Sequence, residues 1–457
     1  MAKQKHIIPV SPGEKLRLTI DSQGSSGDGI CKYKGYTLFA PGGLPGDQVF
    51  VEVIKITPRF GVTRVIKQRF PSPDRVEPPC PVFGTCGGCK LQDLKYEKQI
   101  KFKVGVVKDA MKHIAGIEPP LIRSIPAEKN YHYRNKGSFA VQKQNGFLSM
   151  GFFKQGSHDV ISTEQCEILS DPINEAKEWI RKLLIKHHVS IYNEKNHLGL
   201  FRELVIRHSS STNQLLIGLI TTQGYLPKYF LTDLTAKDVC KSLNICGIVQ
   251  NINSEKTNAI LGDETHILWG QGQLNEKLGN LKFKISLTSF FQVHPEQTIR
   301  LFKTIGEWVK ASAGRTVDAY CGVGAISLWL GKLGLSVVGI EDLAQAVEDA
   351  RKNAKENNIN SCSFIKGIVE DNIRQFKEQD IKTIILDPPR KGCALKVLQT
   401  VSEISPEQVI YVSCNPSTLA RDLTRLKGYR VKEIVVIDLF PQTQHIETAV
   451  LLASTDS

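Results

Sequence analysis

Short runs of alternating apolar and polar residues fill the first part of the chain. The stretch Lys15-Leu-Arg-Leu-Thr-Ile-Asp21 alternates, and similar runs recur up to residue 70 between turns rich in glycine and proline. Alternation with a period of two is typical of strands that bury one face, and regularly spaced short strands indicate a small all-β domain. We therefore predict an OB-type β-barrel over residues 1–70, a fold that often binds oligonucleotides.

The pattern changes after a proline-rich boundary at residues 71–79. Apolar positions recur at helical spacing over residues 98–115, and residues 125–285 mix strand and helix patterns. From residue 288 onward, strand–helix–strand units follow one another, which is typical of an open parallel sheet. The fold class is therefore α/β, preceded by an all-β domain and a central α+β domain.

Composition narrows the class of protein. The chain has 457 residues, enough for two to four domains, and no apolar run approaches 18 residues. Its start lacks the apolar stretch of a secretory signal, so we expect a cytoplasmic protein with no membrane partner. The net charge is +13, and residues 1–70 hold eleven Lys and Arg against five Asp and Glu. A basic excess of this size favours an anionic partner, most often nucleic acid.

Three cysteines lie close together in the segment Cys80-Pro-Val-Phe-Gly-Thr-Cys86-Gly-Gly-Cys89. The glycines permit tight turns that could bring three thiolates onto one metal centre. Zinc and iron–sulfur sites both commonly use four cysteines, so a fourth ligand must come from elsewhere, and Cys166 is our choice. The spacing leaves zinc and iron–sulfur both open.

Cys414 lies where a buried strand is expected to end. It follows the apolar run 408–412 and precedes a helix signal at residues 416–422. Open α/β sheets bind ligands at the carboxyl ends of their strands. A thiol there, with the carboxylate of Glu447 downstream, suits covalent addition to an unreactive carbon followed by general-base catalysis. Because attack requires a thiolate, we expect the local field, including the following helix start, to lower the pKa of Cys414.

A second group of residues suits a nucleotide-like cofactor. The stretch Thr316-Val-Asp-Ala-Tyr-Cys-Gly-Val-Gly-Ala-Ile-Ser-Leu328 predicts a strand, a glycine turn and the start of a helix. Glu341 ends the next predicted strand, where an acid can hold ribose hydroxyls. Asp387 begins an Asp-Pro-Pro-Arg turn after a third strand, a feature of methyltransferases with no evident use in hydride transfer.

Taken together, these segments resemble the uracil-C5 RNA methyltransferases that use S-adenosylmethionine. The resemblance runs through five motifs, which are Ser289-Phe-Phe-Gln-Val293, Val317-Asp-Ala-Tyr-Cys-Gly-Val-Gly324, Leu386-Asp-Pro-Pro-Arg390, Val412-Ser-Cys-Asn-Pro-Ser-Thr-Leu-Ala-Arg-Asp422 and Asp438-Leu-Phe-Pro-Gln-Thr-Gln-His-Ile-Glu447. The glycine-rich turns of the N-terminal region resemble a TRAM domain. A TRAM-like domain together with the cysteine group resembles the branch that methylates 23S ribosomal RNA, since the transfer-RNA branch typically lacks both.

The resemblance implies a class I, Rossmann-like S-adenosylmethionine methyltransferase domain and a set of ligand-binding residues. It implies a [4Fe-4S] cluster held by Cys80, Cys86, Cys89 and Cys166. It also implies a cofactor pocket lined by Gln292, Tyr320, Gly322, Gly324, Ala325, Glu341 and Asp387. Three positions depart from the family pattern. Asn is usual where this chain has Ala325 and His294, and Asn or Asp is usual near Gly367. We expect altered hydrogen bonds at these positions.

The predicted organisation has three domains. They are a TRAM barrel at residues 1–70, a central iron–sulfur and RNA-binding domain at 71–92 and 125–286, and a catalytic domain at 93–124 and 287–457. The resemblance implies that Cys414 adds to C6 of a uracil, that C5 then takes the methyl group, and that Glu447 removes the C5 proton. The base must leave its stack to reach the cysteine, so a flipped nucleotide is expected. Candidates for contacting the RNA are Arg134, Lys136, Phe290 and Phe291.

The prediction is a monomeric enzyme that forms 5-methyluridine in 23S ribosomal RNA. One alternative keeps the chemistry and changes the substrate to transfer RNA. Another is a non-catalytic RNA-binding protein of ribosome assembly, against which the intact pair Cys414 and Glu447 argues. A methylase acting on nitrogen is disfavoured, because Arg390 stands where an aromatic residue is usual and a nitrogen nucleophile needs no cysteine.

Overall fold

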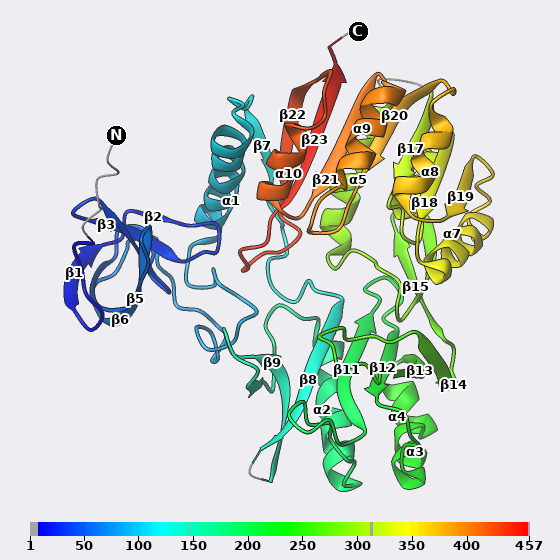
Figure 1. The fold of residues 1–457 in the computed structure, drawn as a ribbon. Coiled ribbons are helices and arrows are strands. Elements are labelled where there is room, and N and C mark those ends of the chain that lie inside the picture. The colour runs from blue at the N-terminus through cyan, green and yellow to red at the C-terminus, as the bar shows by residue number, and fades with distance from the viewer. Residues whose placement is uncertain (1–7, 145, 311–313, 456–457) are drawn as a thin grey trace. The chain divides into compact units, whose positions relative to one another are not determined.

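The computed structural model describes residues 8–144, 146–310 and 314–455, and its fold is drawn in Figure 1. The chain forms two compact units. The first comprises Met1–Val106 with Pro441–Gln444, and the second comprises Val107–Phe440 with His445–Ser457. Within the described ranges, no helix is both long enough and apolar enough to cross a membrane.

The first unit is built on a six-stranded sheet in the order β1-β5-β6-β4-β3-β2. Its strands are β1 (Lys15–Thr19), β2 (Ser22–Gln23), β3 (Gly29–Tyr33), β4 (Tyr36–Ala40), β5 (Gln48–Ile56) and β6 (Phe60–Phe70). Alternate residues such as Leu16, Leu38 and Val51 point into one apolar core, as the period of two predicts. Among the described strands, β1 and β2 end the sheet without pairing to each other, so the predicted OB-type barrel is corrected to an open sheet.

A buried ion network ties the cysteine-containing segment to this sheet. Asp47 is fully buried and accepts hydrogen bonds from the amides of Leu44 and Ser72, both at 2.7 Å. Arg75 forms ion pairs with both Asp47 and Asp93. These bonds hold the pKa of Asp47 below its usual value in spite of burial. The loop that carries Cys80, Cys86 and Cys89 therefore begins from a fixed point.

Helix α1 (Tyr96–Ala110) holds the small inserted segment Pro441–Gln444 in the first unit. The side chain of Gln99 donates to the Leu91 and Leu94 carbonyls and to Oε1 of Gln442, at 2.8–2.9 Å. In return, the amide of Gln442 donates to Oε1 of Gln99 at 3.0 Å. The stretch that leads toward Glu447 is thus fixed by a glutamine pair that is distant in sequence.

The second unit contains an eight-stranded sheet in the order β19-β18-β17-β20-β21-β23-β22-β7. Its strands are β7 (Ile122–Ile125), β17 (Arg315–Ala319), β18 (Val337–Glu341), β19 (Cys362–Lys366), β20 (Ile381–Leu386), β21 (Gln408–Ser413), β22 (Tyr429–Ile437) and β23 (Glu447–Ser454). Strands β17 to β21 run parallel, and β23 runs antiparallel to both β21 and β22. The early strand β7 adds to the outer edge, parallel to β22.

Helices cover this sheet, which explains its continuous apolar strands. They are α5 (Pro295–Lys310), α6 (Ala325–Lys332), α7 (Ala344–Glu356), α8 (Val369–Asn372), α9 (Leu395–Ile404) and α10 (Pro416–Leu423). In Figure 1, α8, α9 and α10 lie in front of the strands. Apolar residues of α5, α6 and α7 form one core with the strands, which includes Phe302, Leu328 and Ile410.

A second, seven-stranded sheet in the same unit includes the strands of the predicted central domain, in the order β10-β9-β8-β11-β12-β13-β14. Its strands are β8 (Lys136–Gln144), β9 (Phe147–Phe153), β10 (Val160–Ser162), β11 (Phe201–His208), β12 (Leu215–Thr221), β13 (Ile245–Ile252) and β14 (Glu264–Gly270). Helices α2 (Asp171–Lys186), α3 (Lys228–Leu234) and α4 (Lys237–Ser242) contribute to its core. The hairpin of β15 (Gln273–Leu278) and β16 (Leu281–Ser286) follows and leads to the catalytic domain.

A buried polar chain joins the central sheet to the catalytic domain. Arg207 of β11 donates to the carbonyls of Leu287 and Ser289. The Ser289 hydroxyl in turn donates to Oδ2 of Asp349 on α7 at 2.8 Å. Each of these groups is buried and partnered, so the motif from Ser289 to Val293 is held on both sides.

Candidate active site

Cys414 directly follows β21, at the carboxyl end of the parallel strands. The next residue, Asn415, caps helix α10 by accepting hydrogen bonds from the amides of Ser417 at 3.1 Å and Thr418 at 3.5 Å. An asparagine cap followed by proline at the first helical position is a strong helix start, so the chain turns sharply here. The thiol is left half-buried at that turn.

Glu447 lies beside this turn although it is 33 positions further along the chain. It begins β23, which pairs antiparallel with β21 so that Thr448 lies opposite Ser413. Only 3% of Glu447 is exposed. Its negative charge is close enough to raise the pKa of the Cys414 thiol. The structure therefore brings the predicted nucleophile and base together.

Two more acids belong to the same edge of the sheet. Asp318 is in β17 and Asp387 follows β20. Burial raises the pKa of each to about 7, and the charge of Asp318 adds to the effect on Asp387. Burial, and then the charge of Asp387, also raises the pKa of Glu447 well above its usual value. Three carboxyl groups that are buried or oppose one another's ionisation suit a ligand that carries positive charge.

The glycine turn provides room for such a ligand. A side chain built on Gly322 would meet no atom within 4 Å, whereas one on Gly324 would meet Phe364 at 2.9 Å. The amide of Gly322 donates to Oε2 of Glu341 at 2.9 Å, and Oε1 of Glu341 accepts from the amide of Leu343 at 2.9 Å. The backbone turn and the acid that ends β18 thus face each other, as the sequence predicts.

These residues fit S-adenosylmethionine. Oδ1 of Asp318 is buried and has no hydrogen-bond partner among the described residues, while Oδ2 accepts from the Ser327 hydroxyl at 2.5 Å. Tyr320 has a left-handed backbone (φ 68°), a conformation that is uncommon away from glycine and that functional sites can hold in place. Asp318, which sequence reasoning did not single out, stands two residues before Tyr320 in the glycine-turn motif.

The departures from the family pattern have local explanations. His294 is buried, stacks on Tyr133 with ring centroids 4.7 Å apart, and bonds the Lys129 carbonyl through Nε2 at 3.1 Å. It therefore anchors the loop, while the Gln292 carbonyl accepts from Nδ2 of Asn135 at 3.3 Å. A side chain on Gly367 would meet Nδ2 of Asn372 at 2.3 Å. Ala325 begins α6 directly after the glycine turn.

The environment of Cys414 corrects one expectation. Burial, followed by the nearby Glu447 charge, raises the thiol pKa to about 11, so the sequence-based prediction of a lowered pKa is wrong for this form. The opposing influence is Arg390, whose charge acts to lower it. Arg390 bonds Nδ1 of His445 at 3.1 Å, and its carbonyl accepts from Asn415 and Thr418, both at 3.2 Å. In the sequence, Arg390 can be found as the arginine of the Asp-Pro-Pro-Arg turn.

The two predicted stacking residues differ sharply. Phe290 is 65% exposed, whereas Phe291 is 4% exposed and packs against Phe283 in the catalytic core. Burial of this kind argues against Phe291 as a surface for RNA. Only Phe290 of this pair is open to a base.

The two basic residues predicted to contact RNA, Arg134 and Lys136, lie around the start of β8. Burial, and then repulsion from Arg207 and Arg134, lowers the pKa of Lys136 to about 7. Arg134 donates from Nε to the Lys136 carbonyl at 3.0 Å, and Lys136 lies directly opposite Arg207 in the sheet. A phosphate placed here would relieve the repulsion among three cations.

The cysteine group fits a metal by donor type but not by arrangement. Cys80, Cys86 and Cys89 are half-buried, and the charge of Cys80 contributes to the raised pKa of Cys86. The amide of Gly88 lies 3.4 Å from the Cys86 sulfur. Nevertheless, residues 8–144, 146–310 and 314–455 contain no group of three or more Cys, His, Asp or Glu side chains arranged to hold a metal. Cys166 belongs to the other unit, where its amide donates to Oδ1 of Asn174 at 3.0 Å.

Comparison with known proteins first identifies the class. The fold matches a solved Pyrococcus abyssi tRNA (uracil-54, C5)-methyltransferase in complex with S-adenosyl-L-homocysteine. The TM-score is 0.78 at 27% identity, and the match covers 96% of this chain and 100% of that one. The fold is therefore that of an S-adenosylmethionine-dependent methyltransferase.

The family follows from the sequence match. The model for tRNA (Uracil-5-)-methyltransferase matches residues 95–455, and the TRAM domain model matches residues 9–66. Proteins named uncharacterized RNA methyltransferase from Clostridium tetani and Bacillus cereus are each 37% identical, with 98% of both chains covered. This chain belongs to the tRNA (uracil-5-)-methyltransferase family and carries an N-terminal TRAM domain, which confirms the predicted family.

Proposed function

We propose that this protein transfers a methyl group to C5 of one uridine in 23S ribosomal RNA and that Cys414 and Glu447 carry the reaction. The observation that supports this most strongly is the thiol at the end of β21, beside a buried carboxylate at the start of β23. Both lie at the sheet edge where α/β proteins bind ligands, next to acids suited to a cationic cofactor.

The reaction is a covalent addition followed by elimination. The Cys414 thiolate forms a bond to C6 of uracil, and the electrons of the C5–C6 double bond make C5 nucleophilic. When bound, S-adenosylmethionine supplies the methyl group to C5, and its sulfonium charge favours the ionised forms of the nearby acids and thiol. The Glu447 carboxylate then takes the C5 proton, the double bond re-forms, and the sulfur leaves as thiolate.

The acids around the Cys414 sulfur influence whether this thiol ionises. In the form described here the thiol holds its proton at neutral pH, because burial and Glu447 both oppose a second negative charge. A carboxyl group with a raised pKa is also a stronger base once ionised, which suits removal of a carbon-bound proton. The site therefore favours a reactive sulfur only when positive charge enters it.

RNA binding is supported by the TRAM domain and by the exposed residues near the site. Arg17, Phe50 and Lys67 lie side by side across three strands of the first unit. The guanidinium of Arg17 lies 4.9 Å from the centre of the Phe50 ring. Cations interleaved with an aromatic ring suit a single-stranded phosphate backbone with stacked bases. In the second unit, Phe290 offers an exposed ring for the flipped uracil.

The substrate proposal has a specific competitor. The Pyrococcus abyssi relative is a tRNA (uracil-54, C5)-methyltransferase, and its likeness covers 96% of this chain. A likeness of that extent includes most of the first unit, so a TRAM domain alone does not separate the two substrates. The cysteine group is the remaining support for 23S ribosomal RNA.

One experiment separates the two RNAs. Unmodified transcripts of 23S ribosomal RNA and of transfer RNA would be incubated with the protein and labelled S-adenosylmethionine, and 5-methyluridine would be mapped in each. The proposal expects label at a single uridine of the ribosomal transcript and none with Cys414→Ala. Label only in transfer RNA would favour the competing substrate. No label in either RNA, together with no cofactor binding, would favour the alternative of a non-catalytic RNA-binding protein.

We further propose a [4Fe-4S] cluster that takes three of its ligands from Cys80, Cys86 and Cys89. The support is the sulfur donor type, the spacing and the glycines between these three residues. Protein purified without oxygen should contain four iron and four sulfide per chain. Zinc at one per chain, or no metal, would contradict this part of the proposal.

A further inference from the structure

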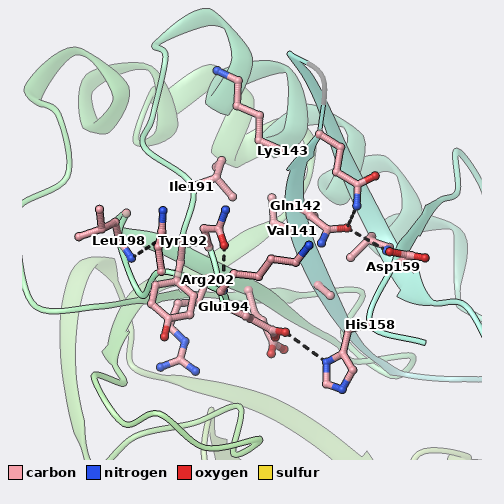
Figure 2. A pocket seen from close by; sticks show the side chains of 18 of the residues that line it. Val141, Gln142, Lys143, His158, Asp159, Ile191, Tyr192, Glu194, Leu198 and Arg202 are labelled. Carbon is pink, nitrogen blue, oxygen red and sulfur yellow. Dashed lines mark hydrogen bonds and ion pairs between the residues drawn. The ribbon is translucent and has the colours of Figure 1, made fainter. Parts of the chain in front are cut away.

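A polar cavity in the central domain lies apart from the candidate active site. Its volume is about 870 Å³. Its walls are the far end of β8, the segment around His158, the loop that includes Tyr192, and the beginning of β11. Gln142, in its wall, is six residues along β8 from Lys136, or about 20 Å at the usual strand rise. Figure 2 shows Tyr192 and Leu198 on one side and His158 and Asp159 on the other.

The charges that line the cavity balance one another. Three cationic and three anionic side chains contribute, namely Lys143, Lys195, Arg202, Asp159, Glu194 and Glu203. A site for a phosphate chain would show an excess of cations. A balanced, polar lining instead suits an uncharged ligand that is recognised by hydrogen bonds.

Glu203 is a charged group in the cavity wall. It lies opposite Ala140 on the sheet, while the next residue, Leu204, enters the apolar core on the other face. Its carboxylate accepts no hydrogen bond from the residues that the structure describes, and burial raises its pKa to about 7. Glu203 is half-buried, and its carboxylate oxygens can accept hydrogen bonds from a ligand in the cavity that supplies N–H groups.

The neighbouring cation does not satisfy Glu203. The guanidinium of Arg202 donates to the carbonyls of Asn253 at 2.6 Å and Glu255 at 2.8 Å. It also lies 4.6 Å from the centre of the Tyr192 ring. The arginine therefore fixes one wall of the cavity, and its hydrogen bonds go to the backbone.

Other groups around the cavity are suited to a flat ligand. Oε1 of Gln142 accepts from Nε2 of Gln144 at 2.7 Å and from the amide of Val160 at 3.1 Å, which fixes the orientation of the Gln142 amide. The rings of Phe153 and His158 lie 5.6 Å apart and offer apolar faces. Aromatic faces beside a hydrogen-bonding edge are how proteins bind unstacked bases of single-stranded RNA.

We propose that this cavity binds one unpaired guanine of the substrate RNA, with the Glu203 carboxylate accepting hydrogen bonds from N1–H and the 2-amino group. A carboxylate has two acceptor oxygens, and guanine presents two adjacent donors on its Watson–Crick edge. Adenine and cytosine place an acceptor nitrogen beside their amino group, and uracil has its one N–H between two carbonyls. The inference rests on the proposed function, because it takes RNA to be the substrate.

The test compares short RNAs that differ in one base. Fluorescein-labelled pentaribonucleotides UUGUU, UUIUU and UUAUU, where I is inosine, would be titrated with the full-length protein and followed by anisotropy. We expect UUGUU to bind roughly 10-fold more tightly than UUAUU, with inosine between them because it lacks the 2-amino group. The preference should disappear in Glu203→Gln. It should remain in Glu307→Gln, which changes an exposed acid on α5.

A second measurement does not depend on a variant. A pentamer with 6-thioguanine in the central position would be cross-linked to the wild-type protein by ultraviolet light, and the peptide identified by mass spectrometry. A cross-link to the segments that line the cavity supports the proposal. A cross-link elsewhere, or equal affinity for UUGUU and UUAUU, overturns it. A wild-type protein that prefers guanine but transfers no methyl group to any RNA would count against the proposed function and not against this cavity.

Discussion

At the scale of single residues, the site is governed by negative charge. Cys414, Glu447, Asp387 and Asp318 come from four different strands or strand ends, and each acid makes ionisation of its neighbour harder. Sequence reasoning identified the nucleophile and the base from their motifs. It was wrong about the thiol pKa, because burial of the thiol, and then the nearby acids, raise it, and both depend on how the strands assemble in the sheet.

Arg390 should control how readily the thiol ionises. In the cofactor-free protein, Arg390→Gln removes the cation that opposes burial and Glu447, so the thiol pKa should rise further. Alkylation of Cys414 by iodoacetamide at pH 8, followed by peptide mass spectrometry, should slow roughly 3- to 10-fold, since each pKa unit changes the thiolate fraction tenfold.

The pH dependence and a control complete this test. In the wild type, alkylation should become faster from pH 7 to pH 10 without a plateau, because a thiol with a pKa of about 11 is still ionising over this range. Arg390→Lys should restore part of the rate, and Lys396→Gln, at an exposed position on α9, should leave it unchanged. An unaltered rate in Arg390→Gln would show that this cation does not act on the sulfur.

Asp318 should destabilise the cofactor-free protein above neutral pH. Its pKa is about 7 when folded against about 3.9 when unfolded, so the folded state binds more protons between these values. The free energy of unfolding therefore falls as pH rises from 4 to 7. Above pH 7, it is lowered by the full free-energy cost of holding an ionised Asp318 in the folded state. Asp318→Asn should raise stability at pH 8 by about 1–3 kcal/mol and leave it unchanged near pH 4.

Thermal unfolding at the two pH values measures this effect. Asp342→Asn, which changes an exposed acid just after β18, is the matched control and should shift neither transition. Cofactor affinity of Asp318→Asn should fall, since a negative group is lost from the pocket. A variant that is less stable at pH 8 would mean that Asp318 is needed for packing instead.

At the scale of elements, periodicity predicted strands well and their assembly less well. The period of two located the inward residues of β1, and the apolar run before Cys414 became β21. Closure of the first sheet could not be predicted, because alternation is the same in an open and a closed sheet. Phe290 and Phe291 are adjacent and of the same residue type, so the sequence did not show which one is buried.

The ion network of the first unit should be important for its stability. Arg75→Ala leaves Asp47 buried without its cation, which should lower the free energy of unfolding by about 2–4 kcal/mol. Urea unfolding of the full chain, with hydrogen exchange of β5 and β6 as a local probe, would measure it. Arg64→Ala breaks only the more exposed pair with Glu52 and should cost under about 1 kcal/mol. Equal effects of the two changes would contradict the importance of the buried network.

At the scale of the whole molecule, charge predicts an RNA partner. The net charge of +13 was visible in the sequence, and so was its concentration in residues 1–70. The sequence could not reveal that Arg17, Phe50 and Lys67 form one row across strands, because this depends on register. It also could not reveal the cavity beside Glu203, whose lining residues lie between Ala140 and Glu203 in the chain.

The row of cations on the first unit should contribute phosphate contacts. Changing both Arg17 and Lys67 to alanine should weaken binding to single-stranded RNA and reduce the slope of log affinity against log salt by about 1.4, or 0.7 for each lost contact. Anisotropy titrations at several salt concentrations would measure the slope. Alanine at Lys332 and Lys427, two exposed lysines of the second unit, should change it little. The same slope in both double variants would place the RNA elsewhere.

The central claim is that the sulfur of Cys414 bonds to the uracil ring during methyl transfer. It is tested most directly with substrate RNA that contains 5-fluorouridine, because fluorine at C5 cannot be removed as a proton by Glu447 and the adduct should persist. The account predicts a stable protein–RNA cross-link, found by mass spectrometry on the peptide that contains Cys414 and carrying the transferred methyl group. Normal methylation of unmodified RNA with no cross-link to the fluorinated RNA, or a cross-link at another residue, would contradict it.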